Sequence, residues 1–261
     1  MQLRDSKNLS ALTNDQIDQY HTDGYLVASG LIPDDISGRA EDFMWELLGM
    51  DRHDPSTWST IPEDVFHVQS RNLMEHFAIK DEALIACATP EFMTATSQLL
   101  DVPQSSFHMP RSVQTQNVFP MPGPWKPPGF HIDGIPEENK HKTFPGPFKI
   151  AFIVYLSDVK SQGGGTFAWP GSHREIAELA RTDPEKFEYL YVLNRHLSEA
   201  DLGDPVELLP KRGDILFFQH LWAHGATMNC NGTPRMALRF LCSCKSCLRW
   251  KKRDGWSLWT P

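Results

Sequence analysis

The segment Phe130-His131-Ile132-Asp133-Gly134 places an imidazole and a carboxylate two residues apart. In an extended strand, the side chains of residues i and i+2 point to the same face, so His131 and Asp133 can reach one ion. A second histidine would complete the two-histidine, one-carboxylate set that holds non-haem Fe(II) and leaves three positions of an octahedral ion open. The tripeptide is a weak signal by itself, because a His and an Asp at this spacing more often share a hydrogen bond.

The later segment 219–225, Gln-His-Leu-Trp-Ala-His-Gly, offers two candidates for the missing histidine. His224 is followed by Gly225, where the backbone can approach a bound ligand closely. For His220, the sequence favours a structural role as a packed or hydrogen-bonded strand residue. The expected metal ligands are therefore His131, Asp133 and His224.

An arginine follows His224 at a distance that suits a carboxylate anchor. Arg235 comes eleven residues later, and a hairpin turn at Asn231-Gly232 would return it to the neighbouring strand. From there its guanidinium could hold a carboxylate with two hydrogen bonds within reach of the metal. Arg239 lies on the same face of that strand and is the alternative anchor.

The elements that must position these residues fall into two halves. The first half is mainly helical: Thr13 and Gln16 form a capping-box pattern, Asp23-Gly24 ends that helix, and Pro33-Asp34-Asp35 opens a second one. From residue 106, short β-type runs alternate with Gly- and Pro-rich turns, which indicates a β-barrel or sandwich with an outer helical layer. The expected helices are 72–88, 90–100, 172–182 and 184–190, and the expected strands are 25–28, 111–119, 129–132, 148–157, 166–169, 205–209, 214–220, 225–228 and 235–243.

Composition limits the class of protein. The 261 residues are 40% hydrophobic and carry a formal charge of −8, which disfavours nucleic acid as a partner and favours a small-molecule substrate. The chain contains no window of about 18 apolar residues and no secretory-type N-terminus, so we expect neither a membrane span nor export. An odd count of five cysteines indicates reduced thiols and a cytoplasmic location. Nothing in the sequence sets an oligomeric state.

Several segments, in order, resemble the phytanoyl-CoA dioxygenase family of Fe(II)/2-oxoglutarate oxygenases. They are the opening helix and strand up to 24–27, the His131-Ile132-Asp133-Gly134 motif, the run from 163–166 to 170–173 (Gly-Gly-Gly-Thr to Pro-Gly-Ser-His), and 213–218 followed by His224-Gly225 and Arg235. The resemblance spans about residues 12–243. It implies a mainly β fold with flanking helices, whose core is a double-stranded β-helix (a cupin-like jelly roll).

The resemblance also implies cofactors and their contacts. Fe(II), 2-oxoglutarate and O₂ are the expected cofactor and co-substrates, and Arg235 is expected to pair with the distal carboxylate of 2-oxoglutarate. Thr166 and Asn117 are further expected contacts, although the phase of the strand pleat leaves Gln114 and Gln116 as alternatives to Asn117. Halogenating relatives lack the carboxylate that Asp133 supplies, so hydroxylation or a related oxidation is favoured.

We expect a single domain over residues 1–261, with a helical layer at 1–105, the jelly-roll core at 106–248 and a tail at 249–261. Two other functions use parts of the same pattern: a zinc-dependent hydrolase would use the same three ligands, and a non-catalytic jelly roll would use none. Neither assigns a role to Arg235. Cys242, Cys244 and Cys247 lack a fourth ligand at zinc-finger spacing, so we interpret them as reduced thiols.

Overall fold

The computed structural model describes residues 10–59, 79–106, 112–134, 136–144 and 146–241. Its α-helices are α1 (Asn14–Asp23), α2 (Asp34–Leu48), α4 (Glu82–Ile85), α5 (Pro90–Leu100), α6 (Ser172–Thr182) and α7 (Leu190–Asn194). Short 3₁₀ helices lie at Pro55–Ser59, Gln104–Ser106, Glu137–Asn139 and Leu197–Glu199. None of these helices combines the length and the apolar character that crossing a membrane requires.

The strands form two antiparallel sheets. The larger has the order β1-β6-β3-β8-β2, and the smaller has the order β5-β4-β7. Both orders contain crossovers between strands that are distant in sequence, as a jelly roll requires. The strands are β1 (Tyr25–Ala28), β2 (Gln114–Thr115), β3 (Ile150–Tyr155), β4 (Thr166–Ala168), β5 (Val206–Glu207), β6 (Ile215–Gln219), β7 (His224–Ala226) and β8 (Ala237–Leu241).

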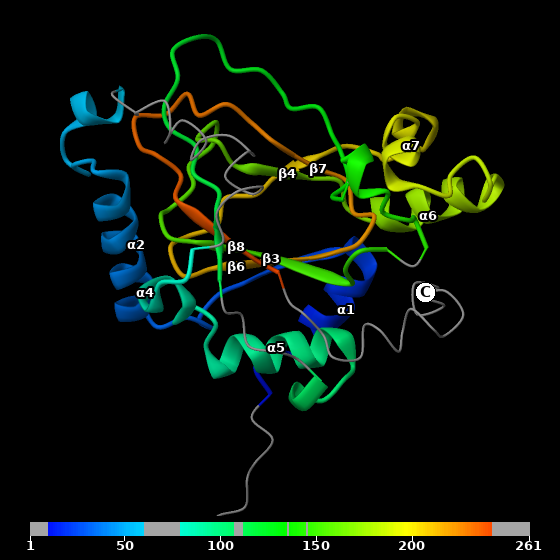
Figure 1. Cartoon of the computed structure of the whole chain (residues 1–261), viewed down its shortest axis with the longest axis horizontal. Helices are drawn as coiled ribbons and strands as arrows, with labels where there is room; N and C mark the ends of the chain where they lie inside the picture. The colour runs from blue at the N-terminus through cyan, green and yellow to red at the C-terminus, as the bar shows by residue number, and fades with distance from the viewer. Residues whose placement is uncertain (1–9, 60–78, 107–111, 135, 145, 242–261) are drawn as a thin grey trace, which may run out of the picture.

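Helices α1, α2, α4 and α5 cover the outer face of the larger sheet, while α6 and α7 lie beside the smaller one (Figure 1). Phe92 of α5 anchors the first layer, because its ring centroid lies 4.8 Å from that of Phe152, 5.7 Å from Phe217 and 5.9 Å from Phe240. These rings alternate along their strands with residues of the opposite face, so one face of β3, β6 and β8 belongs to the helical layer.

The opposite face of the larger sheet looks toward the smaller sheet. Tyr25, Ile153 and Phe218 of the larger sheet form one buried cluster with Ala168 of β4. By the same alternation, Arg235, Ala237 and Arg239 share this inner face. The interior between the sheets is therefore the place where a polar site can be built.

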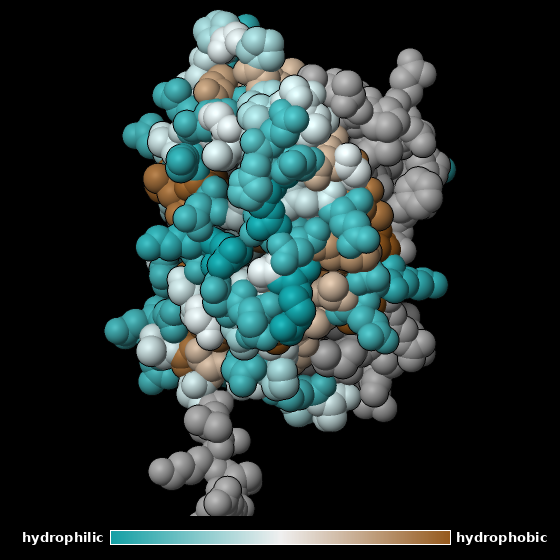
Figure 2. Space-filling model, turned by 90° about the vertical axis from the view of Figure 1, so that its left-hand side faces the viewer, coloured by the Kyte–Doolittle hydropathy of each residue, from teal (hydrophilic) through white to brown (hydrophobic). Residues whose placement is uncertain are grey.

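The outer surface of α2 is polar, which is expected of a helix that buries one stripe against a sheet. Figure 2 shows the side of the molecule on which α2 lies, and hydrophilic residues cover most of it. The opposite stripe of the helix, with Ala40, Met44 and Trp45, is buried in the layer between helices and sheet.

Most expected elements are confirmed, including the jelly-roll class. Thr13 and Gln16 form the capping box of α1, and α5 and α6 have the expected bounds. The expected strands at 111–119 and 129–132 are shorter than expected, since the structure has β2 at Gln114–Thr115 and isolated bridges at Val118 and His131. Part of the 72–88 helix and the three C-terminal cysteines lie outside the described residues, and the proposed division into layer, core and tail stays a prediction.

The expected helix at 184–190 is wrong. The chain makes a single turn in which the Phe187 N–H donates to the Asp183 carbonyl. Tyr189 is then extended and forms a bridge with Lys142, and α7 begins only at Leu190. The pairing of Tyr189 with a segment distant in sequence overrides the local helical preference.

Gly24 is a position where both the backbone conformation and a close neighbour exclude a side chain. It ends α1 with φ +81°, and an added Cβ would lie 2.4 Å from His173 Nδ1. We expect Gly24→Ala to lose about 1–2 kcal/mol from the left-handed backbone and more from this contact. Gly30→Ala is the matched control, because Gly30 has φ +76° and no atom within 4 Å of an added Cβ. Chemical denaturation of both variants tests this; equal losses would contradict the role of the His173 contact.

Candidate metal centre

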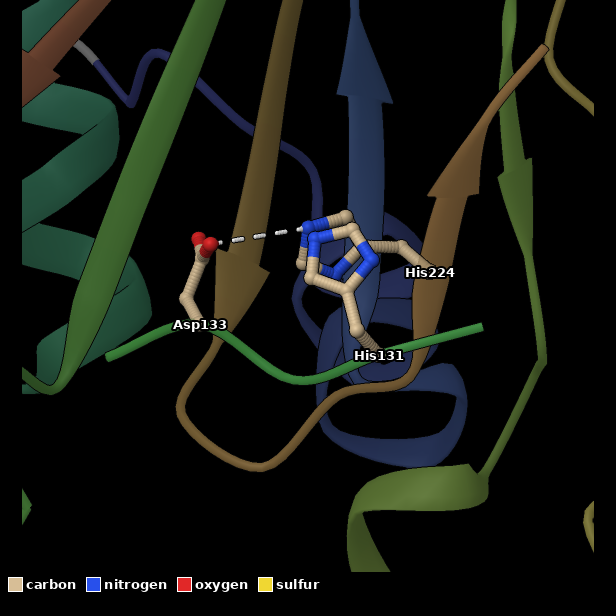
Figure 3. Close-up of side chains that lie close together, drawn as sticks. All are labelled: His131, Asp133 and His224. Atoms are coloured by element: carbon tan, nitrogen blue, oxygen red, sulfur yellow. Dashed lines mark ion pairs between the residues drawn. The ribbon is translucent and has the colours of Figure 1, made fainter. Parts of the chain in front are cut away.

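His131, Asp133 and His224 converge inside the protein. Each offers one ligand atom, and the three atoms lie within 4.8 Å of one another. The ring centroids of the two histidines are 4.5 Å apart, and Asp133 Oδ1 lies 3.8 Å from His224 Nε2 (Figure 3). The side chains of Asp133 and His224 are only 13% and 10% exposed, so these two ligands are largely shielded from water.

Backbone pairing brings the two histidines together. The His131 N–H donates to the His224 carbonyl at 2.9 Å, and the His224 N–H donates to the His131 carbonyl at 3.0 Å. A residue pair that exchanges both bonds in an antiparallel bridge places its side chains on one face. The His131 segment thereby extends the smaller sheet next to β7.

Ile132 fixes which way its neighbours point. Its side chain is fully buried in the cluster beneath α6 and α7, and its N–H donates to Asn194 Oδ1 at 3.0 Å. Because alternate residues of an extended segment face opposite ways, His131 and Asp133 point inward. Asn194, at the end of α7, is a positioning residue that no sequence pattern marked.

Trp222 orients His224 in two ways. His224 Nδ1 lies 3.1 Å from the Trp222 carbonyl, which suits an Nδ1–H donor and leaves the Nε2 lone pair for a metal. The indole is stacked on the imidazole at 12°, with centroids 5.0 Å apart. Since Trp222 is itself 1% exposed, it can hold the imidazole in one orientation.

Gly225 is needed for a different reason from the one expected. A Cβ at this position would lie 2.1 Å from the Gly129 carbonyl oxygen. The close neighbour of Gly225 is thus the backbone that leads into the His131 segment. A side chain here would push that segment away from β7 and separate the two histidines.

Arg235 lies deeper between the sheets and is 4% exposed. Its Nη2 donates to the Gln116 carbonyl at 3.0 Å, whereas its buried Nε has no hydrogen-bond partner among the described residues. Burial lowers the pKa of Arg235, and the nearby Tyr155 opposes that shift. The Tyr155 hydroxyl lies 3.2 Å from Thr166 Oγ1, so a guanidinium and two hydroxyls lie in one buried region.

Asn117 lies away from this region. Its amide nitrogen contacts Met44 Sδ of α2 at 3.4 Å, and its oxygen accepts from the Ala237 N–H at 3.2 Å. The pleat turns Asn117 to the helical layer and Gln114 to the inner face, where Gln114 pairs in register with Arg239. The expected contact of Asn117 with a co-substrate is therefore corrected, because the alternation of the strand has the opposite phase.

His220 has the structural role that the sequence favoured. It is 1% exposed, and its Nε2 lies 2.9 Å from the Thr143 carbonyl, to which it can donate. Burial lowers the pKa of His220 to about 4, so the ring is neutral. The structure gathers His224, and not His220, with His131 and Asp133.

The donor set suits a ferrous ion. Two imidazole nitrogens and one carboxylate oxygen form the facial set of non-haem iron enzymes, and no thiolate lies among them. Atoms that share one octahedral ion at about 2.1 Å lie about 3 Å apart, so the observed group needs only a small contraction. A buried cation nearby would favour a co-substrate with a carboxylate.

Comparisons with known proteins agree with this fold. The larger part of the chain, residues 20–237, matches the family model for phytanoyl-CoA dioxygenase (PhyH). One similar solved structure is AviO1 from Streptomyces viridochromogenes Tue57, with a TM-score of 0.55 and 16% identity over 88% of this chain and 93% of that one. Another is EctD from S. alaskensis with 2-oxoglutarate and 5-hydroxyectoine, with a TM-score of 0.56 and 15% identity over 91% of this chain and 78% of that one. A third is SnoK, an α-ketoglutarate-dependent carbocyclase from nogalamycin biosynthesis, with a TM-score of 0.52 and 16% identity over 89% of this chain and 85% of that one. No curated protein sequence matches the chain.

The fold and donor set define a non-haem iron oxygenase of the jelly-roll type. The chain belongs to the phytanoyl-CoA dioxygenase family. It is accordingly a dioxygenase that uses Fe(II), 2-oxoglutarate and O₂, as the sequence predicted. This assignment disagrees with both the zinc hydrolase and the non-catalytic binding protein.

Two buried histidines give stability a defined pH dependence. Burial lowers the pKa of both His173 and His220 to about 4, from an ordinary value of 6.5. Between these values the unfolded chain binds protons that the folded chain does not, so stability falls as pH decreases from 6.5 toward 4. We expect His220→Gln to make this fall shallower, as measured by denaturation of the metal-free protein at several pH values. An unchanged slope would count against a buried neutral His220.

Proposed function

We propose that His131, Asp133 and His224 bind Fe(II), and that Arg235 and Thr166 bind the distal carboxylate of 2-oxoglutarate. The observation that carries this proposal is the convergence of the three donors inside a barrel that also buries Arg235. Asn117 is not included, because its side chain faces the helical layer.

The residues around the metal centre supply positions and exclude water. When bound, the iron and its co-substrates supply an oxidant that can replace a C–H bond by C–O–H, with one oxygen atom of O₂ in the product and the other in succinate, and with release of CO₂. His131, Asp133 and His224 would hold the ion from one side and leave positions on it for the co-substrates. The low exposure of Asp133 and His224 limits the access of competing water to the site.

Arg235 has the properties of an anion anchor. A buried guanidinium is costly unless it meets a negative charge, and burial lowers the pKa of Arg235 for that reason. A carboxylate beside it could accept hydrogen bonds from the guanidinium and from the hydroxyls of Thr166 and Tyr155. The cost of burying Arg235 in the absence of a co-substrate then favours binding of 2-oxoglutarate.

The reaction we favour is hydroxylation of a small metabolite or natural-product intermediate. EctD was solved with 5-hydroxyectoine, and SnoK is described as acting in nogalamycin biosynthesis. Both are small-molecule chemistries on this fold. The presence of the Asp133 carboxylate favours oxygenation over halogenation, because it fills the position that a halide would need.

We also propose that the protein works in the cytoplasm on a small molecule and not on nucleic acid. The formal charge of −8 disfavours a phosphate backbone. Of the cysteines in the described part of the chain, Cys87 is a buried free thiol whose pKa burial raises to about 12, and Cys230 is a half-buried free thiol. Reduced thiols suit a reducing compartment.

The ligand assignment can be tested by turnover. We expect the wild-type protein to form succinate from 2-oxoglutarate only when Fe(II) and O₂ are present, and we expect His224→Ala to abolish this activity. His220→Gln should remain active, because it keeps a hydrogen-bond donor for Thr143 and removes no metal ligand. Mass spectrometry of succinate measures both; loss of activity only in the His220 variant would move the ligand assignment.

The role of Arg235 can be tested by binding. With Mn²⁺ as a redox-inert stand-in for iron, 2-oxoglutarate should raise the melting temperature of the wild type. For Arg235→Gln, we expect an increase of about 100-fold in the dissociation constant of 2-oxoglutarate, because two charge-assisted hydrogen bonds are lost. Thermal-shift titration measures this, and wild-type affinity in the variant would assign the anchor elsewhere.

A further inference from the structure

Arg239 is a second buried arginine that this mechanism does not use. It lies in β8, with Ile153 of β3 and Gln114 of β2 as its neighbours across the sheet. Its side chain is 9% exposed, and Nη2 lies 2.6 Å from Asp133 Oδ2. A charge-assisted hydrogen bond of this length in a nearly dry interior is a strong contact.

The two oxygens of Asp133 have different neighbours. Oδ2 accepts from Arg239 at 2.6 Å, while Oδ1 is the oxygen 3.8 Å from His224 Nε2. The oxygen that faces the other ligands is therefore not the one that Arg239 holds. The bond to Arg239 uses one lone pair of Oδ2 and fixes the rotation of the carboxylate, so that Oδ1, with both of its lone pairs free of Arg239, is the oxygen turned toward His224.

We infer that Arg239 is a positioning residue that holds Asp133 as a one-oxygen metal ligand. The inference rests on the proposed function, because it assigns a role at the same metal centre. One-oxygen coordination matters, since a carboxylate that bound through both oxygens would fill one of the three positions that 2-oxoglutarate and O₂ need. Partners of this kind, one step behind the ligands, commonly contribute to metal affinity.

The alternative role for Arg239 is to bind a carboxylate of 2-oxoglutarate. Arg235 lies four residues earlier, in the segment that leads into β8, about 13 Å away along an extended chain. Arg235 is beside Tyr155 and Thr166, whereas Arg239 is beside the metal ligand Asp133. The two arginines thus occupy different levels of the barrel, and equivalent substitutions in them should have different effects.

The test is titration with Mn²⁺ in the absence of 2-oxoglutarate, followed by the EPR signal of the free ion. We expect Arg239→Lys to raise the dissociation constant of Mn²⁺ by about 10-fold or more. Lysine keeps the positive charge near the metal but lacks the planar fork that orients a carboxylate. Any loss therefore reports geometry and not charge. Melting temperature and circular dichroism check that the variant folds.

Arg235→Lys is the matched control, since it makes the same substitution on the same inner face. We expect it to bind Mn²⁺ as the wild type does and to weaken only 2-oxoglutarate. If Arg239→Lys binds Mn²⁺ with wild-type affinity, the inference is overturned; if it then also requires more 2-oxoglutarate, Arg239 is a co-substrate anchor. If the wild type shows no Mn²⁺ site that His224→Ala removes, the proposed function itself fails.

A second variant covers the case in which Arg239→Lys does not fold. Arg239→Gln is uncharged and cannot hold Oδ2 in the same way, so the visible absorption of bound Co²⁺, which reports coordination, should differ from that of the wild type. Arg235→Gln should leave the Co²⁺ spectrum unchanged. Identical spectra for the wild type and Arg239→Gln would overturn the inference.

Discussion

The metal centre depends on the pair of backbone hydrogen bonds between His131 and His224. These bonds attach the His131 segment to β7 and place both imidazoles on the inner face of the smaller sheet. Gly225 is the condition for this pairing, because a side chain there would occupy the space of the Gly129 carbonyl. All three ligand residues lie on these two segments. The rest of the fold must then bring the remaining polar groups up to them.

The larger sheet supplies the cations that face this centre. Arg239 lies on its inner face and Arg235 on the segment that leads into β8, so the site exists only where the two sheets face each other. This division explains why an acidic protein buries two guanidiniums. One is beside a protein carboxylate, Asp133, and the other has a lowered pKa in a region that suits a carboxylate ligand. Each buried guanidinium needs a negatively charged partner, because an unpaired charge in a dry interior costs folding free energy.

The helical first half of the described chain contributes through packing. The outer face of the larger sheet is apolar, and Phe92 together with Met44 and Trp45 covers it. A sheet covered on one side in this way can keep the other side for polar residues. Structures that share only 15–16% identity with the chain, such as EctD and SnoK, have the same fold, so the architecture tolerates wide changes in sequence. The phytanoyl-CoA dioxygenase match over residues 20–237 includes both the helical layer and the barrel.

The sequence by itself determined the local features: the His-x-Asp spacing that puts two ligands on one face, the capping box of α1, the bounds of α5 and α6, and the eleven-residue step from His224 to Arg235. The tertiary structure decided what depends on partners distant in the chain. It turned Asn117 toward α2, ended the expected 184–190 helix by pairing Tyr189 with Lys142, and placed Arg239 against Asp133. The physical reason is the two-residue period of a strand. Local sequence fixes which residues share a face, but only the packing of the two sheets and the helices decides which face looks inward.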